Sequence, residues 1–113
     1  NVYVSEYGND RIQVFDPQGR FLRKWGVTGS GNGDFRWPQG LCIDDEGNVY
    51  VSEYGNSRIQ VFDLQGRFLR KWGSEGNGDG ELGQPQDLTV DSEGNVYVSD
   101  QSNHRIQVFK PTV

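Results

Sequence analysis

Apolar and polar residues alternate with a period of two in several short stretches of this chain. Residues 1–5 read Asn-Val-Tyr-Val-Ser and residues 11–15 read Arg-Ile-Gln-Val-Phe, and both stretches return later in the same register. This is the period of a β-strand, whose successive side chains point to opposite faces of a sheet. Polar segments rich in Gly separate the stretches, and none carries the period of a helix. The pattern predicts an all-β fold of short strands joined by tight turns.

The whole pattern repeats every 47 residues. Residues 1–9 return unchanged at 48–56 and in altered form at 95–103, and about two-thirds of positions are identical between 1–47 and 48–94. Such a long identical period is the signature of a repeat architecture. The similarity of the copies indicates a duplicated or deliberately designed sequence.

Each repeat is predicted to hold four antiparallel strands. In the middle copy these are strand A at residues 41–44, strand B at 48–52, strand C at 58–62 and strand D at 67–72. Gly47 can adopt the positive φ of a tight turn, and a Gly-rich loop at 73–84 leads to the next strand A. Four short strands in 40–50 residues are typical of a β-propeller blade. A β-sandwich is the alternative, but it does not explain a unit that repeats in fixed register.

The repeat resembles the NHL repeat family. The residues that carry the resemblance are Pro-Gln-Asp-Leu-Thr-Val-Asp-Ser-Glu-Gly-Asn-Val-Tyr-Val-Ser-Asp at 85–100, followed by Asn-His-Arg-Ile-Gln-Val-Phe at 103–109. Segments 63–69 and 73–82 resemble the family's later strands and its inter-blade loop. The resemblance covers the entire chain and implies an NHL-type β-propeller, usually of six blades. Members of the family mostly act as protein-binding or RNA-binding platforms, and some relatives are lyases or hydrolases.

The chain holds fewer blades than a full member. We expect a partial blade of strands B-C-D at residues 1–26, a complete blade at 38–73 and a partial blade of strands A-B-C at 85–113. Missing strands leave open sheet edges, which pair readily with another chain. The expected partner is therefore a second or third copy, so that a homo-oligomer of two or three chains closes a six-bladed ring.

Composition narrows the range of other partners. The chain has 113 residues, a net charge of −5 and no cluster of Lys and Arg, so nucleic acid is an unlikely ligand. No apolar stretch is long enough for a membrane-spanning helix. Cys42 is the only cysteine, lies in an apolar run and is expected to be a small buried hydrophobic residue. The compartment in which the protein works cannot be read from the sequence.

Two sets of charged residues recur once per repeat. They are Arg11, Arg58 and Arg105 before strand C, and Asp44 and Asp91 at the end of strand A. A ring of ligand-binding groups is one interpretation. The favoured one is structural, because a residue present in every blade is suited to holding that blade together. The Arg side chain is a fork of several donors that can tie loops and backbone carbonyls.

The D–A loops and the B–C turns should emerge on one face of the propeller. Arg36 and Trp37 on this face break the repeat, since they replace Gly83 and Gln84 of the next copy. The expected binding face also includes Tyr7, which recurs as Tyr54. Its candidate residues are Arg36, Trp37, Gln39, Tyr54, Gln86, Asp87, Asp100 and His104. A mixture of aromatic residues, Arg and carboxylates suits protein or peptide recognition.

Catalytic and metal signals are weak. His104 is the only histidine, no Gly-x-Ser-x-Gly motif occurs, and one His and one Cys cannot assemble a metal site. The Gly-Asn-Gly-Asp segment at 31–34 has oxygen ligands but lacks the spacing of a calcium loop. We therefore expect a non-catalytic binding or scaffold module without a cofactor. The alternatives are a propeller hydrolase or lyase with an axial metal at Asp87, and an RNA-binding platform.

Overall fold

The computed structural model describes residues 1–110 of the chain, so the last three residues of the predicted blade at 85–113 lie outside the described part. It contains ten strands and one 3-10 turn. The strands are β1 (Val2–Glu6), β2 (Arg11–Phe15), β3 (Phe21–Trp25), β4 (Pro38–Ile43), β5 (Val49–Glu53), β6 (Arg58–Phe62), β7 (Phe68–Trp72), β8 (Pro85–Val90), β9 (Val96–Asp100) and β10 (Arg105–Phe109). The 3-10 turn is η1 (Gln101–Asn103). No helix in this part of the chain is long and apolar enough to cross a membrane.

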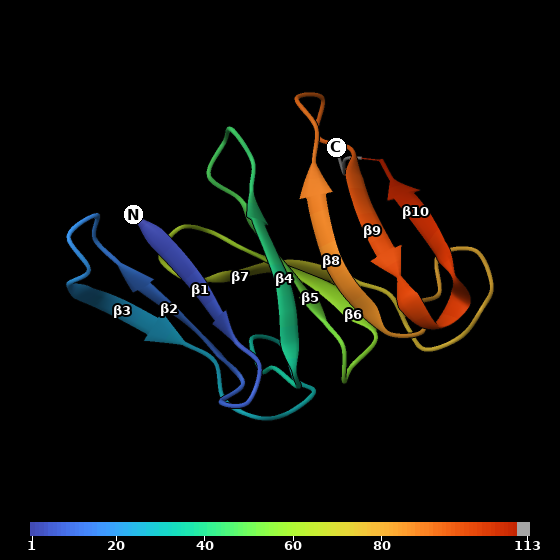
Figure 1. Cartoon of the computed structure of the whole chain (residues 1–113), viewed down its shortest axis with the longest axis horizontal. Helices are drawn as coiled ribbons and strands as arrows, with labels where there is room; N and C mark the ends of the chain where they lie inside the picture. The colour runs from blue at the N-terminus through green and yellow to red at the C-terminus, as the bar shows by residue number, and fades with distance from the viewer. Residues whose placement is uncertain (111–113) are drawn as a thin grey trace.

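The strands form three antiparallel sheets that stand side by side like segments of a fan (Figure 1). The first blade is β1-β2-β3, the middle blade is β4-β5-β6-β7 and the last blade is β8-β9-β10. Strand β4 contacts both β1 and β8, so the inner strands of the three blades lie along one edge of the fan. This arrangement confirms the predicted all-β fold of antiparallel blades, of which the middle one has four strands and the other two have three.

Strand A begins three residues earlier than the sequence predicted. The observed strands start at Pro38 and Pro85, and the pairing shifts register between Pro38 and Leu41 and between Pro85 and Leu88. Proline is tolerated at the first residue of a strand, and a bulge adds residues without ending the pairing. As a result, Gln39, like Gln86 of the next blade, lies inside an inner strand rather than in front of it.

Two apolar clusters join the blades. One contains Ile12 of the first blade, Val49, Val51 and Phe62 of the middle blade, and Phe35 from the loop between them. In the other, Leu82 takes the place of Phe35 and joins the middle blade to the last blade. Phe35 and Leu82 are both completely buried. Each inter-blade loop therefore inserts one apolar side chain between the sheets that it connects.

Serine side chains close the same junctions at the inner edge. Ser5 Oγ donates a hydrogen bond to the carbonyl of Gln39 at 2.9 Å, and Ser52 Oγ lies 3.3 Å from the carbonyl of Gln86. Both bonds run from strand B of one blade to strand A of the next. The junction between blades is thus apolar at its centre and hydrogen-bonded along its inner edge.

Truncation of Phe35 should destabilise the chain far more than truncation of an exposed Phe. Phe35 is 0% exposed and packs on Phe62, whereas Phe21 is 54% exposed. Phe35→Ala should lower the free energy of unfolding by about 3–5 kcal/mol, because it removes a buried ring and leaves a cavity. Urea unfolding followed by Trp fluorescence measures both variants. Equal losses for Phe35→Ala and Phe21→Ala would contradict the position of Phe35 between the blades.

Candidate binding face

The B–C turns and the segments that lead into strand A meet at one end of each blade. In the middle blade, the backbone N–H groups of Tyr54 and Gly55 donate to the carbonyls of Trp37 and Arg36 at 2.9 and 3.0 Å. In the last blade, Gln101 N–H donates to the carbonyl of Gln84 at 3.2 Å. The backbone thus brings the turns and loops of the expected binding face together.

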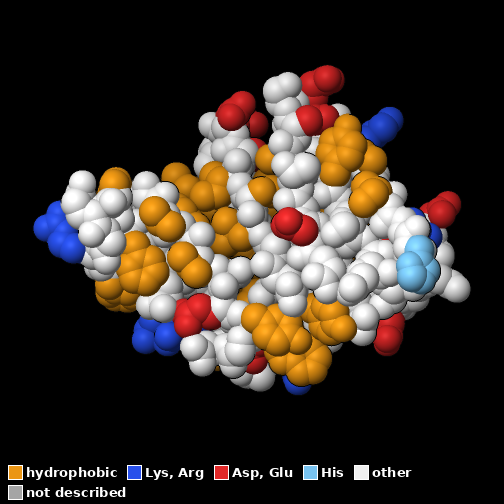
Figure 2. Space-filling view, viewed as in Figure 1, with side chains coloured by type: hydrophobic (Ala, Val, Ile, Leu, Met, Phe, Trp, Pro, Cys, Tyr) orange, Lys and Arg blue, Asp and Glu red, His pale blue; other side chains and the backbone are white. Residues whose placement is uncertain are grey.

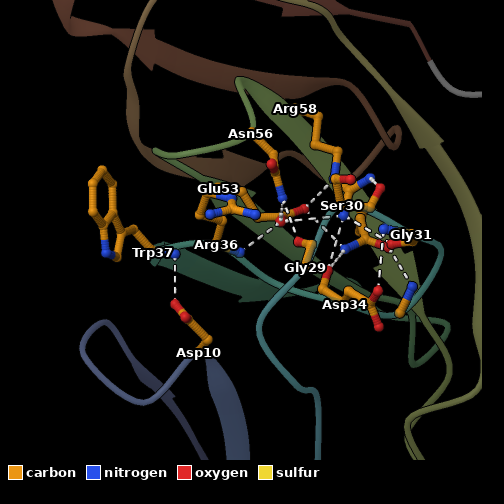
Figure 3. Close-up of polar contacts among 12 residues, drawn as sticks. Asp10, Gly29, Ser30, Gly31, Asp34, Arg36, Trp37, Glu53, Asn56 and Arg58 are labelled. Atoms are coloured by element: carbon orange, nitrogen blue, oxygen red, sulfur yellow. Dashed lines mark hydrogen bonds and ion pairs between the residues drawn. The ribbon is translucent and has the colours of Figure 1, made fainter.

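A carboxylate at the end of strand B organises this end of the middle blade. Glu53 is 0% exposed and accepts hydrogen bonds from Arg58 Nε at 2.6 Å, and from the side-chain amides of Asn56 and Gln60, both at 2.8 Å. The Arg36 backbone N–H adds a fourth bond at 3.2 Å. Figure 3 shows Glu53 at the centre of these contacts. We call Glu53, Asn56, Arg58 and Gln60 the hub of the middle blade.

The hub holds the loop that arrives from the first blade. Arg58 donates to the carbonyls of Ser30, Gly31 and Asp34 at 2.7, 3.0 and 2.9 Å (Figure 3). The carboxylate of Asp34 accepts the N–H of Gly31 at 3.2 Å. Four oxygen atoms of this loop therefore bind the Arg58 guanidinium or the Gly31 N–H.

The last blade has an equivalent hub, in which Asp100 takes the place of Glu53. Arg105 binds Asp100 at 3.0 Å and donates to the carbonyls of Asn77, Gly78 and Glu81. Burial alone would raise the pKa of Asp100, but bonds from Asn103, the Gly83 N–H and Arg105 hold it below the ordinary value. Sequence analysis placed Asp100 on the binding face. In the structure Asp100 is completely buried, because its carboxylate accepts the hydrogen bonds of the hub.

The hub of the first blade consists of Glu6, Asn9, Arg11 and Gln13. Arg11 binds Glu6 at 2.6 Å, but among the described residues no loop carbonyl contacts its guanidinium. The bond from Arg11, with help from Asn9 and Gln13, lowers the pKa of Glu6 to about 2. The same bond raises the pKa of Arg11. The ion pair therefore forms without the loop that accompanies it in the other two blades.

The recurring Asp44 and Asp91 lie in the turns between strands A and B. Asp44 accepts the backbone N–H groups of Glu46 and Asn48 at 3.0 and 2.8 Å, and Asp91 binds Glu93 and Asn95 in the same way at 2.9 Å. Burial would raise the pKa of Asp44, but these bonds keep it below its usual value. Both carboxylates hold their turns together through these hydrogen bonds.

Three aromatic side chains gather beside the hub of the middle blade. Tyr7 stacks on Trp37 with ring centroids 5.9 Å apart, and Tyr54 lies 6.0 Å from Trp37 and 6.4 Å from Tyr7. Tyr7 and Trp37 are 45% and 44% exposed, and Tyr54 is half-buried. Figure 2 shows hydrophobic side chains grouped at this end of the molecule, below the start of β4. We call these three residues the aromatic cluster.

A departure from the repeat holds Trp37 in place. Trp37 has a φ of 53°, in the left-handed region that is costly for a bulky residue. Its backbone N–H donates to Asp10 Oδ1 at 2.7 Å, while Thr28 donates to Asp10 Oδ2 at 2.7 Å. Figure 3 shows the indole pointing away from the hub. Sequence analysis missed Asp10, although its replacement of the Ser found at position 57 was a visible signal.

The equivalent junction of the next two blades is polar. There Ser57 donates to the carbonyl of Gly83 at 2.7 Å, Gln84 accepts from Ser102 at 2.6 Å, and Gln86 donates to Gln101 at 2.6 Å. His104 is exposed and ends the 3-10 turn with a φ of 55°. The structure thus separates the candidate residues into an aromatic group around Trp37 and a polar group near Gln86.

The remaining candidates lie on the inner strands. Gln39 is half-buried, and its carbonyl is bound by Ser5. Asp87 is exposed and lines a shallow pocket together with Tyr97, Ser99 and Ile106. Within residues 1–110, no three His, Cys, Asp or Glu side chains are close enough to hold a metal ion together. Cys42 is half-buried, and desolvation raises the pKa of its thiol to about 12.

Comparisons with known proteins connect this architecture to a repeat family. The NHL repeat matches the chain twice, at residues 35–62 and 82–109. The sequence has no significant match among curated proteins.

The solved structures that share the fold include three with the following likeness. Catalytically inactive virginiamycin B lyase from Staphylococcus aureus, with quinupristin, has a TM-score of 0.66 and 17% identity over 98% of this chain and 38% of its own. A protein of unknown function from Bacteroides caccae has a TM-score of 0.54 and 18% identity over 88% and 38%. A gluconolactonase from Xanthomonas campestris has a TM-score of 0.54 and 23% identity over 89% and 34%. The chain therefore spans well under half the length of these proteins, and the likeness shows the fold alone.

Loss of the buried Glu53 carboxylate should lower the free energy of unfolding far more than loss of the more exposed Glu6 carboxylate. Glu53→Gln leaves the Arg58 guanidinium, whose side chain is only 7% exposed, without its counter-charge. We expect a loss of about 3–5 kcal/mol in the free energy of unfolding, as for other broken buried ion pairs. Glu6→Gln, where the Arg11 side chain is 32% exposed, should cost much less. Urea unfolding compares the two; equal losses would show that burial does not set the strength of the hub.

The ion pair between Glu6 and Arg11 in the first blade should remain formed at acidic pH. The pKa of Glu6 is lowered from 4.5 to about 2 in the folded chain, so its ionised form is favoured by folding. Its contribution to stability is therefore complete above pH 4.5 and is lost as the pH falls through 2. NMR titration of the Glu6 side-chain carboxyl should give a midpoint near 2. A midpoint near 4.5 would mean that Arg11 does not bind it in solution.

Proposed function

We propose, from the premise that this chain carries two NHL repeats of a β-propeller, that it is a non-catalytic module which binds a protein or peptide on the face of its B–C turns and D–A loops. The aromatic cluster is the observation that carries this proposal. It consists of Tyr7, Trp37 and Tyr54, and it is formed by two B–C turns and one D–A loop.

The cluster has the chemistry of a protein-binding centre. Trp and Tyr dominate the binding energy of protein interfaces, because they bury large area and lose few rotatable bonds. Here two of the rings are almost half exposed, although a soluble domain normally buries such area. The exposed Arg36 lies directly beside them in the sequence, and Arg is the other residue enriched at such centres.

The local backbone supports a binding role as well. Trp37 adopts a left-handed conformation that the two hydrogen bonds to Asp10 make possible. Strained non-Gly conformations persist only where the surroundings impose them, and they cluster at ligand-binding sites. The chain therefore stabilises an unfavourable backbone that presents an aromatic ring to solvent.

A binding role also agrees with how the acidic residues are used. Glu53 and Asp100 are occupied inside hubs, and Asp44 and Asp91 are occupied in turns. A general acid or base must reach the substrate proton directly or through one water. These four carboxylates are instead directed at backbone N–H groups and Arg side chains of the chain itself.

A selection experiment with a matched control tests the proposal. A displayed peptide library is selected on the wild-type chain, and the enriched peptides are then measured against Trp37→Ala and Gln84→Ala. Position 84 is the equivalent of 37 in the next repeat, so the control changes the same place in a polar surrounding. Trp37→Ala should weaken binding about tenfold or more, as at an interface hot spot, whereas Gln84→Ala should change it little.

Circular dichroism of both variants checks that the fold is intact. Enriched peptides that bind Trp37→Ala as tightly as wild type would overturn the proposed face. Failure to enrich any peptide would equally count against peptide recognition by this chain.

A further inference from the structure

The loops between the blades contain two Asn-Gly pairs. Asn32-Gly33 precedes the middle blade and Asn77-Gly78 precedes the last blade, and each pair follows a further Gly. An Asn before Gly can lose its side-chain amide without an enzyme, because Gly has no side chain to hinder attack of its backbone nitrogen on the Asn carbonyl. Asn32 and Asn77 are both exposed, so water reaches both. The pairs differ in the group that binds the Gly nitrogen.

The nitrogen of Gly33 is bound by a neutral side chain. Its N–H donates to Oε1 of Gln60 at 2.9 Å, and Gln60 is completely buried. A neutral amide oxygen accepts a hydrogen bond but is too weak a base to take up the proton. The bond therefore holds the Gly33 nitrogen against the middle blade without activating it.

The nitrogen of Gly78 is bound by a carboxylate. Its N–H donates to Oε1 of Glu81 at 2.9 Å. A Cβ placed on Gly78 would come within 2.9 Å of this oxygen, and a Cβ on Gly76 would also contact it. The carboxylate thus lies beside both glycines that flank Asn77. A general base must lie about 2.6–3.2 Å from the atom whose proton it takes, and Glu81 meets this condition.

The side chain of Asn77 is free to turn toward this nitrogen. Within the described part of the chain its amide group makes no hydrogen bond, whereas its backbone carbonyl accepts from Arg105 Nη1 at 3.1 Å. The backbone at Asn77 is therefore held in place while the reactive side chain can rotate.

The loop before the middle blade has the same turn but a different residue at the reactive position. There the Asp34 carboxylate accepts the N–H of Gly31 at 3.2 Å, and Ser30 stands where the second loop has Asn77. Ser30 is exposed although its loop lies in front of a blade with a neighbour on both sides. Exposure at this position is therefore a property of the blade itself.

We propose that Asn77 is a site of self-catalysed deamidation, with Glu81 as the base. The Gly78 nitrogen attacks Cγ of Asn77 while Glu81 accepts the proton of that nitrogen. A bond forms between this nitrogen and Cγ, the bond between Cγ and Nδ2 breaks, and Nδ2 leaves as ammonia with the proton that Glu81 returns. One water molecule then opens the succinimide ring at either carbonyl. The sum is one water consumed, one ammonia released, and aspartate or isoaspartate at position 77.

Isoaspartate at this position separates two carbonyls that the hub of the last blade binds. The carbonyls of Asn77 and Gly78 accept from Arg105 Nη1 and Nη2 at 3.1 and 2.8 Å. In isoaspartate the main chain runs through Cβ and Cγ, so one more carbon lies between the two residues, and the former main-chain carbonyl becomes a free carboxylate. The two oxygens then no longer fit one guanidinium, and the loop is held less firmly to the last blade.

This reaction is independent of the proposed peptide-binding role. It takes place at the junction of the middle and last blades, whereas the aromatic cluster joins the first and middle blades. Failure of one proposal therefore leaves the other intact.

The two Asn-Gly pairs test the proposal within one molecule. The folded chain is incubated at neutral pH, and peptide mapping by mass spectrometry measures deamidation at Asn32 and Asn77. Asn77 should react at least about tenfold faster, as expected for a positioned general base. In the urea-unfolded chain the two rates should be nearly equal, because both residues lie in Gly-Asn-Gly. Equal rates in the folded chain, or a faster Asn32, would overturn the assignment.

Matched variants identify the base. Glu81→Gln keeps an oxygen that can accept the Gly78 N–H but removes the carboxylate, and it should slow deamidation of Asn77 about tenfold or more. Asp34→Asn makes the same change in the other loop and should leave the rate at Asn77 unaltered. Circular dichroism checks that both variants are folded. An unchanged rate in folded Glu81→Gln means that Glu81 is not the base.

The structural consequence has its own test. The isoaspartate form, purified from the incubated chain, is compared with Asn77→Asp, which carries the same additional charge on a normal backbone. The isoaspartate form should unfold at a lower urea concentration, and Asn77→Asp should unfold close to the wild type. Equal midpoints for the two forms would show that the additional main-chain carbon does not disturb the contacts with Arg105.

Discussion

The rest of the structure depends on the hydrogen bonds between a buried Arg and the loop that precedes its blade in the sequence. Arg58 is fixed by Glu53 on one side and binds three loop carbonyls on the other. The bound loop is held with Phe35 between the sheets and leads the chain into β4. The Arg58 contact and the burial of Phe35 together fix this Gly-rich loop against the middle blade.

The two nearly identical repeats differ in the hydrogen bond that joins the B–C turn to the loop before strand A. At one junction Asp10 accepts the N–H of Trp37, and at the next Ser57 donates to a carbonyl. The turn residue therefore accepts a hydrogen bond at the first junction and donates one at the second, and the backbone conformation differs between the two. The surface differs as well: aromatic rings are exposed at the first junction, and side-chain amides are hydrogen-bonded at the second. The repeated residues form the blades, and the few unrepeated residues determine which side chains are exposed on the surface at each junction.

The sequence predicted most of the fold, because alternation and a 47-residue period leave few other architectures. It also indicated that the repeated Arg residues would bind loop carbonyls. It could not show that Asp100 is buried, because the same residue type serves as an exposed carboxylate or as the centre of a hub. Nor could it show the conformation of Trp37, which depends on a contact with Asp10, 27 residues away. Nor could it show that the strand begins at Pro38, because the pairing shifts register between Pro38 and Leu41.

The hub has a consequence for how such a protein can change in size. Its carboxylate, amides and guanidinium all come from one blade, and the loop that it holds comes immediately before that blade. Insertion of another 47-residue segment would therefore supply both the anchor and the loop that fits it, with no adjustment elsewhere. Tandem duplication of the underlying DNA can lengthen the array one blade at a time, and only the curvature needed to close a circle limits the count.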